Sequence, residues 1–265
     1  MPVALFQSEL LEEANLAGVD PSTIWRHPHE AVASAPPGPV ASGTETGMAE
    51  RVDDKHRQRL EEIVRSDPGL MDLLVRLREI GLPQWRLVAG CLYQTVWNVL
   101  TGRPRGTGIR DYDVIYFDPD DLSYEAEDRV IRRVADTTSH GIGPVEVRNQ
   151  ARVHLWFETR FLVPYRALSS ADEALRRYAS VVHAVGVRLD DDGRLDVLAP
   201  FGLDDLFGMV IRPNRALDNA ESHTRKAIRA QAIWPEVTVV PWGVGIASDD
   251  GPCRRSGTSP SPACL

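Results

Sequence analysis

The strongest constraint on the fold of this chain is a short apolar run, VIYF, enclosed by carboxylates in RDYDVIYFDPDD (110–121). Alternate side chains of a β-strand point to the same face, so Asp111 and Asp113 share one face, and Tyr112 and Val114 share the other. Two carboxylates on one face repel each other unless a cation neutralises them. Mg²⁺ takes oxygen ligands of this kind, commonly one or two carboxylates plus substrate phosphates. The strand therefore predicts a metal site.

Three further carboxylates, Asp118, Asp120 and Asp121, follow the apolar run. Aspartate is a common turn residue because its side chain accepts hydrogen bonds from nearby backbone N–H groups. We therefore expect these three side chains to form a turn and the entry to a helix over 122–136, with Ser123 as its cap, rather than a metal site.

A second alternating pattern lies in PVEVRNQARVHLWF, which predicts one long strand over 144–157. The polar side chains of its first part fall on one face: Glu146, Arg148, Gln150, Arg152 and His154. The solvated face of an antiparallel sheet would show the same pattern. If this strand lies beside the Asp111–Asp113 strand, Glu146 supplies a third carboxylate, and the two arginines can bind phosphate oxygens through forked hydrogen bonds.

A third segment, VAGCLYQTVWN (88–98), predicts a strand over 85–90 that leads through Gly90 into a helix over 92–102. A glycine at this place lets a phosphate approach the backbone, and a helix N-terminus offers unpaired N–H groups to an anion. A glycine in a strand-to-helix turn is common, so this segment alone does not establish a phosphate site.

The remaining patterns predict further helices and a hairpin around these strands. Apolar residues at three- and four-residue spacing indicate helices, and Asp192-Gly193 indicates a tight turn. The order of elements predicts an α/β (α+β) domain with a mixed central sheet flanked by helices. The expected additional elements are helices over 49–66, 69–81, 171–180 and 219–233, a hairpin over 184–200 and a short helical turn at Asp204-Asp205.

Composition divides the chain into three parts. Residues 31–47 and 243–265 are rich in Pro, Gly, Ser and Ala, and the segment before residue 31 can form a short helix but is too small to fold alone. This predicts a disordered N-terminal extension over 1–47 and a disordered tail over 243–265 around a folded domain over 48–242. The net charge of −8 argues against a general nucleic-acid binder. The three cysteines show no disulfide or metal spacing, and no apolar run is long enough to span a membrane, so a cytoplasmic location is expected.

These segments together resemble a known superfamily. A strand that ends in glycine and a small residue, then a helix, then a strand with Asp-x-Asp is similar to the polymerase-β-like nucleotidyltransferases. A bacterial group of nucleotidyltransferase-like proteins within that superfamily is more similar still, over residues 85–242. The blocks that carry this resemblance are AGCLYQTVWN, RDYDVIYFDPDDLS, VEVRNQARVH, AVGVRL and APFGLDDLFGMVIRPN.

The resemblance implies a role for individual residues. Gly90 and Cys91 match the pair that holds the nucleotide phosphates, and Asp111 and Asp113 match the pair that binds catalytic Mg²⁺, with Mn²⁺ as a second candidate. Glu146 is the candidate third carboxylate. The chain departs from the superfamily pattern at Cys91, where serine is usual, and in GRPRGTG (102–108), which has the appearance of an insertion.

The expected activity is metal-dependent transfer of a nucleoside monophosphate from an NTP to a hydroxyl acceptor. The acidic composition favours a small-molecule acceptor over a protein or an RNA, whereas the sequence does not indicate an oligomeric state. Two other functions stay open. Paired carboxylates also serve metal-dependent phosphodiester hydrolases, and a nucleotide-binding domain can keep this fold without turnover.

Overall fold

A computed structural model describes residues 54–138, 142–161 and 164–243 of the chain. The predicted disordered segments 1–47 and 243–265 lie outside these ranges, apart from Gly243. No helix within the described ranges combines the length and the apolar character that a membrane span requires.

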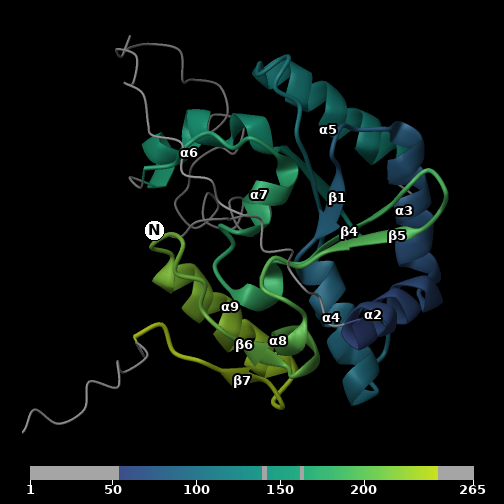
Figure 1. Ribbon diagram of the computed structural model, residues 1–265, viewed down its shortest axis with the longest axis vertical. Coiled ribbons are helices and arrows are strands. Elements are labelled where there is room, and N and C mark those ends of the chain that lie inside the picture. The colour runs from purple at the N-terminus through teal and green to yellow at the C-terminus, as the bar shows by residue number, and fades with distance from the viewer. Residues whose placement is uncertain (1–53, 139–141, 162–163, 244–265) are drawn as a thin grey trace, which may run out of the picture.

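Helices and short strands alternate along the described chain (Figure 1). Most elements lie close to the predicted ranges. In chain order they are α2 (Asp54–Ser66), α3 (Pro68–Ile80), β1 (Arg86–Val88), α4 (Gly90–Thr101), β2 (Tyr112–Tyr116), α5 (Tyr124–Thr138), β3 (Val145–Asn149), the 3-10 turn η2 (Gln150–Arg152), α6 (Val153–Phe161), α7 (Ala171–Leu175), the 3-10 turn η3 (Val181–His183), β4 (Gly186–Leu189), β5 (Leu195–Leu198), α8 (Asp204–Phe207), β6 (Val210–Ile211), α9 (Ala220–Ile233) and β7 (Thr238–Val239).

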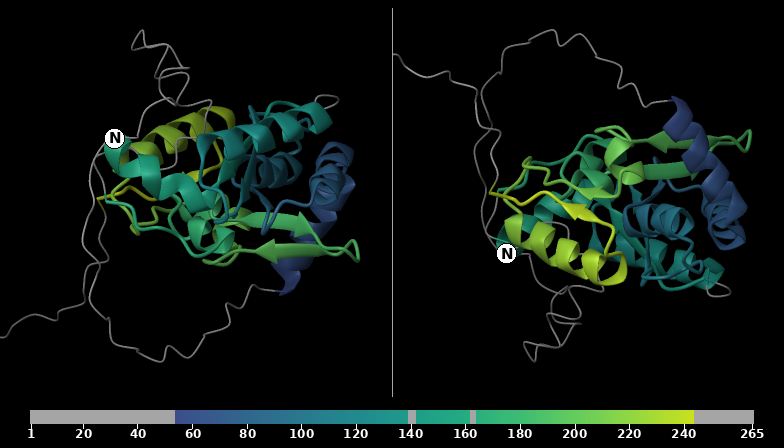
Figure 2. Two further views of the ribbon diagram at one scale, coloured as in Figure 1. Left: turned by 90° about the horizontal axis from the view of Figure 1, so that it is seen from above. Right: turned by 90° about the horizontal axis from the view of Figure 1, so that it is seen from below.

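A five-stranded sheet in the order β3-β2-β1-β4-β5 forms the centre of the structure. The pair β2–β3 is parallel and the other three pairs are antiparallel, while β6 and β7 form a separate parallel pair. The helices α2 and α3 lie at the opposite end of the molecule from α9 (Figure 2). This mixed sheet flanked by helices confirms the predicted fold class.

One face of the sheet is apolar and buried under helices. Its side chains share the main core with α2, α3, α4 and α5, and each fully buried side chain contributes about 1.5–3 kcal/mol. The side chains that carry this face, one from each strand, are Leu87, Val114, Val147, Val187 and Val197.

The opposite face carries the polar side chains. Asp113 is paired with Val88 of β1 on one side and with Glu146 of β3 on the other, so these three residues point to the same face. This register confirms the period-two interpretation of β2 and of the start of β3. A smaller core, which includes Val88 and Ile115, packs between this face and α7.

The prediction of one strand over 144–157 is wrong beyond Asn149, because β3 ends at that residue. The Asn149 side chain accepts hydrogen bonds from the backbone N–H groups of Ala151 (3.1 Å) and Asp118 (3.1 Å) and donates to the Asp118 carbonyl (2.8 Å). Such local side-chain bonds compete with the strand ladder and turn the chain into η2 and α6. The shared face predicted for Glu146 and Arg152 is therefore lost.

The end of β3 instead brings Arg152 to α5. Its guanidinium pairs with Glu127 and donates to the Leu122 carbonyl (2.8 Å), and Glu127 also accepts from the Asn149 backbone N–H (2.8 Å). Both charged side chains are buried. This ion pair fixes α5 to the end of the central strands.

The acidic segment after β2 forms the predicted turn. Asp118 accepts from the Asp120 N–H (3.1 Å), and Asp121 accepts from the Ser123 N–H (2.9 Å). Ser123 then caps α5 by accepting from the Ala126 N–H (3.2 Å), as predicted. The helix expected over 171–180 is shorter, because α7 ends at Leu175.

The buried Glu127–Arg152 pair gives a test of stability. We expect Glu127→Ala to lower the free energy of unfolding by about 3–5 kcal/mol, because it leaves Arg152 buried without its counter-charge. Urea unfolding measures the loss. The matched control is Glu125→Ala on the exposed side of the same helix, with an expected change within about 0.5 kcal/mol. Equal losses in the two variants would contradict this role of the pair.

Candidate functional site

The turn between β1 and α4 has a strained residue at its centre. Ala89 has φ 58° and ψ −118°, a left-handed conformation that residues with a side chain rarely adopt. Its N–H donates to the Val185 carbonyl (3.0 Å), and its carbonyl accepts from the Leu92 N–H (3.1 Å). The N–H groups of Gly90 and Cys91 therefore precede the first hydrogen bond of the helix, at the positive end of its dipole.

Gly90 leaves open space beside this helix start. Its φ does not lie in the left-handed region, and a Cβ added to it would meet only the Gln94 amide, at 3.5 Å. Neither the backbone conformation nor packing inside the chain therefore requires glycine here. The missing side chain instead keeps the backbone accessible to a ligand.

Cys91 contributes only its backbone to this turn. Its thiol is fully buried and donates to the Val88 carbonyl at 3.5 Å. Burial, followed by the nearby Asp113 and Asp111 carboxylates, raises the pKa of the thiol well above its ordinary value. The side chain is therefore a neutral core group, whereas the serine that is usual here would carry a stronger donor.

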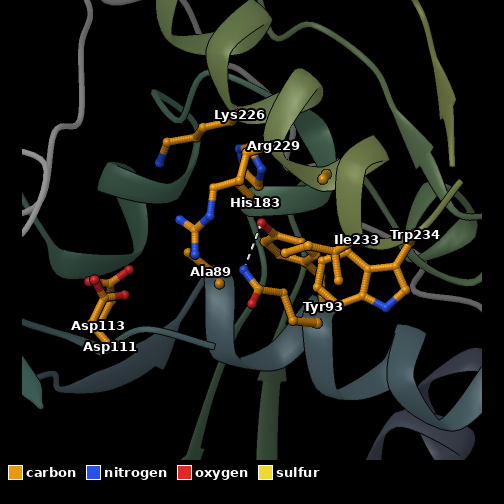
Figure 3. A pocket seen from close by; sticks show the side chains of 12 residues that line it. Ala89, Tyr93, Asp111, Asp113, His183, Lys226, Arg229, Ile233 and Trp234 are labelled. Atoms are coloured by element: carbon orange, nitrogen blue, oxygen red, sulfur yellow. Dashed lines mark hydrogen bonds between the residues drawn. The ribbon is translucent and has the colours of Figure 1, made fainter. Parts of the chain in front are cut away.

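A pocket opens beside Gly90, bounded by the β1–α4 turn, the start of β2, η3 and α9 (Figure 3). Asp111 and Asp113 both line one end of it. Asp113 is only 5% exposed, and the antiparallel register that pairs it with Val88 places it next to the strained turn. The pocket therefore brings together the predicted carboxylate pair and the predicted phosphate-binding turn.

The opposite wall of the pocket is α9, which the sequence interpretation had not linked to the site. Lys226 and Arg229 lie three residues apart, so they occupy neighbouring positions on one helix face, and both line the pocket. Arg229 donates to the Gly108 carbonyl (2.9 Å), which holds its guanidinium in place. The pocket thus has a carboxylate wall and a cationic wall.

The segment GRPRGTG (102–108) follows α4 in the chain and packs against the end of α9, so it holds the two helices together. Gly108 lies so close to Trp234 that a Cβ would come within 2.5 Å of the indole. Asn98 of α4 donates to the Thr107 carbonyl (3.0 Å) and accepts from the Trp234 indole N–H (3.1 Å). This apparent insertion is therefore part of the support for the cationic wall.

The other predicted site residues do not line the pocket. Glu146 shares a sheet face with Asp113 and is its register partner, and Arg148 follows on the same face. Arg152 is bound to Glu127 at the end of α5, because β3 ends before it. Among the described residues, no group of three or more His, Cys, Asp or Glu side chains is placed to hold a metal ion.

The match to known families is decisive at this point. A family model described as nucleotidyltransferase matches residues 75–239, which contain all the site residues named above. The chain belongs to this nucleotidyltransferase family. Nucleotidyl transfer is accordingly the activity of the protein. No curated protein sequence matches the chain significantly.

Solved structures resemble this nucleotidyltransferase. An NMR structure described as revealing a CCA-adding enzyme head domain has 25% identity and a TM-score of 0.57, over 69% of this chain and 95% of that one. A CCA-adding enzyme with CTP has 18% identity and a TM-score of 0.41, over 72% of this chain and 43% of its own. The Thermotoga maritima CCA-adding enzyme with tRNA has 16% identity and a TM-score of 0.37, over 73% of this chain and 41% of its own.

The chain spans less than half the length of the last two enzymes. The head domain, in contrast, matches over nearly its whole length. Together with the family match, this neighbour confirms the predicted polymerase-β-like nucleotidyltransferase fold.

The carboxylate wall of the nucleotidyltransferase fits a magnesium ion by its donor chemistry. Asp111 and Asp113 offer hard anionic oxygens, and both face the pocket. Mg²⁺ commonly binds through one or two carboxylates and leaves its other positions to water and substrate phosphates. Two carboxylates beside the predicted phosphate-binding turn therefore suit this ion.

His183, from η3, is a neutral group in the pocket lining. It is 3% exposed, and burial, followed by the nearby Lys226 and His223, lowers its pKa well below the ordinary value of 6.5. A base with a depressed pKa takes up a proton more readily in the unfolded chain. Its contribution to stability is therefore complete above pH 6.5 and is lost as the pH falls from there through the pKa of the folded state.

We expect His183→Gln to weaken the pH dependence of stability. Below pH 6.5, one such group makes the free energy of unfolding fall by up to about 1.4 kcal/mol per pH unit, and the variant lacks this contribution. Urea unfolding of both proteins between pH 4 and 8 (roughly the range over which one histidine titrates) measures the slopes. His223 is retained in both proteins and contributes equally to the two slopes. Identical slopes would therefore contradict this prediction, because they would show that His183 takes up its proton at the same pH in the folded and the unfolded chain.

Proposed function

We propose that this nucleotidyltransferase transfers a nucleoside monophosphate from an NTP to a hydroxyl group, with Mg²⁺ bound by Asp111 and Asp113. The observation that carries the proposal is the single pocket in which these two carboxylates, the open backbone at Gly90 and two α9 cations meet. Each of these groups matches one part of a magnesium–triphosphate substrate.

The metal would be held by the carboxylate wall. When bound there, Mg²⁺ neutralises negative charge that develops on the phosphate oxygens during transfer. Asp111 and Asp113 would hold it near the start of α4, because both carboxylates line that end of the pocket and the register of β2 with β1 places Asp113 next to Val88. Glu146, which lies on the same sheet face as Asp113, is kept in the proposal as a proton acceptor and not as a third metal ligand, because no three such side chains of the described residues are placed to hold one ion.

The triphosphate would lie between the helix start and α9. The Gly90 and Cys91 N–H groups precede the first hydrogen bond of α4 and can donate to a phosphate oxygen. Lys226 and Arg229 supply positive charge from the other side of the pocket. In this arrangement they bind the β- and γ-phosphates. The sequence had predicted contacts with phosphate oxygens from Arg148 and Arg152 instead.

The transfer follows from these positions. The acceptor oxygen attacks the α-phosphorus and forms a new P–O bond, while the bond from the α-phosphorus to the bridging oxygen breaks. Pyrophosphate leaves with that electron pair, towards Lys226 and Arg229. The proton of the acceptor hydroxyl goes to a carboxylate, for which Glu146 is the candidate.

The acceptor is proposed to be a small molecule. The support for this choice is the net charge of −8, which disfavours a long nucleic acid. Protein and RNA acceptors are the alternatives that an acceptor screen distinguishes. Labelled NTP incubated with a small-molecule extract, a protein extract or an RNA pool shows which fraction becomes labelled.

We expect Asp113→Asn to reduce magnesium-dependent pyrophosphate release by about a hundredfold or more, because the pocket loses one metal-binding charge. The matched control is Asp120→Asn, an exposed carboxylate of the same acidic segment, which should keep full activity. Pyrophosphate release is measured with each NTP and an acceptor that is labelled in the screen. Equal activity of the two variants would contradict the assignment of Asp113.

Two other outcomes would favour the alternative functions. Cleavage of a phosphodiester without any NTP, abolished by Asp113→Asn, would indicate a hydrolase. Tight binding of NTP without pyrophosphate release in the presence of every acceptor fraction would indicate a catalytically silent nucleotide-binding domain.

We expect Lys226→Ala to weaken the binding of magnesium–NTP and of inorganic tripolyphosphate by a similar factor of about ten, because in the proposed arrangement Lys226 binds the phosphates that the two compounds share. Titration calorimetry measures both affinities. Lys55→Ala, an exposed lysine on α2, is the matched control and should bind both compounds as the unmodified protein does. A loss confined to the NTP would contradict phosphate binding by Lys226.

A further inference from the structure

We propose that the inner end of the pocket is a nucleobase-binding subsite in which Gln94 and His183 bind the polar edge of the base. This inference rests on the proposed use of an NTP and adds to it the residues that distinguish one NTP from another. It follows from three features: apolar walls, a buried amide oxygen of Gln94 and the buried ring nitrogens of His183, none of which has a hydrogen-bond partner among the described residues.

The walls of this subsite are aromatic and aliphatic. Tyr93 of α4, together with Ile233 and Trp234 at the end of α9, lines the pocket away from Asp111 and Asp113 (Figure 3). Trp234 is held by its hydrogen bond to Asn98, so this wall has a fixed position. Ligand sites for planar groups combine apolar surfaces of this kind with a few placed polar atoms.

The first placed polar group is the Gln94 amide. Its nitrogen donates to the Tyr93 hydroxyl (3.0 Å), which holds the side chain beside the ring. Its oxygen is buried and has no hydrogen-bond partner among the described residues, although the side chain lines the pocket. An unsatisfied buried acceptor costs about 1–3 kcal/mol, so this position favours a ligand that brings an N–H donor.

The second placed polar group is His183. Both of its ring nitrogens are buried without a hydrogen-bond partner in the described part of the chain. A neutral imidazole offers one N–H donor and one acceptor, and the ring centre lies 5.1 Å from that of Tyr93. Gln94 and His183 are therefore both next to the same tyrosine, and together they present two acceptors and one donor.

A nucleobase fits this combination better than the other parts of an NTP. A fully ionised phosphate cannot donate a hydrogen bond to the Gln94 oxygen, and Arg229, one of the two cations that would bind it, lies between this end and the carboxylates (Figure 3). A base presents adjacent donors and acceptors on its edge and apolar faces on both sides. The base edge would satisfy Gln94 and His183 while its faces contact the apolar walls.

Binding of ligands with and without a base tests this subsite. Titration calorimetry in the presence of Mg²⁺ measures the affinities of the protein for ATP, CTP, GTP and UTP and for inorganic tripolyphosphate, which has no base. We expect the unmodified protein to distinguish the four NTPs. Gln94→Met removes the acceptor but keeps the length of the side chain. This variant should lower the affinity for the preferred NTP by about tenfold and leave the affinity for tripolyphosphate unchanged.

Two further variants complete the experiment. Tyr93→Phe removes the hydrogen bond that holds the Gln94 amide in position, and it should therefore reduce the differences in affinity among the four NTPs. Tyr93→Phe keeps the packing of the ring. It therefore still tests whether the Gln94 amide takes part in base recognition if Gln94→Met fails to fold. Gln58→Met, at an exposed position of α2, is the control and should bind every ligand unchanged.

The possible results separate this inference from the proposed function. Failure of the unmodified protein to bind any NTP would overturn both. NTP binding with the same preferences in Gln94→Met and Tyr93→Phe as in the unmodified protein would overturn the subsite alone. Equal weakening of tripolyphosphate and NTP by Gln94→Met would also overturn it, because the side chain would then act on the phosphates.

Discussion

The antiparallel register that pairs Val88 with Asp113 is the constraint on which the rest of the site depends. It places the last residue of β1 beside a carboxylate of β2, so the chain turns into α4 at the place where negative charge is concentrated. The positive end of that helix then lies close to Asp111 and Asp113. A shift of this register by one residue would move both carboxylates into the apolar core on the other face.

The second wall of the pocket depends on tertiary packing rather than on the sheet. Trp234, Asn98 and Gly108 join α9 to α4, and the same loop holds Arg229 through the Gly108 carbonyl. The overall charge of the chain is negative, but this wall of the pocket carries the cations Lys226 and Arg229. On the proposed function, this local placement would allow an acidic protein to bind an anionic substrate.

The sequence predicted those parts of the site that depend on local periodicity. The alternation in β2 placed Asp111 and Asp113 together, and the turn formed by Asp118 and Asp121 followed from aspartate chemistry. The alternation after Asn149 was misleading, because nothing in a two-residue period shows that a side-chain cap ends the strand.

The cationic wall could not be located from the sequence alone, because α9 meets the carboxylates only through long-range packing. The available signal was the spacing of Lys226 and Arg229, which places two cations on one helix face. His183 and Gln94 carried no such signal, since a single polar residue next to apolar neighbours does not indicate what it faces. Only the folded structure, in which these side chains line one pocket, shows that they lie close together.

The position of α9 in the chain has a consequence for synthesis. The two carboxylates and the start of α4 leave the ribosome first, and the last helix of the described chain supplies the opposite wall. A nascent chain that ends before α9 already contains the proposed metal ligands but lacks the cations and the aromatic wall. On the proposed function, nucleotide binding would therefore begin only when α9 has emerged and docked, and nucleotide would stabilise the finished domain without assisting its earlier folding.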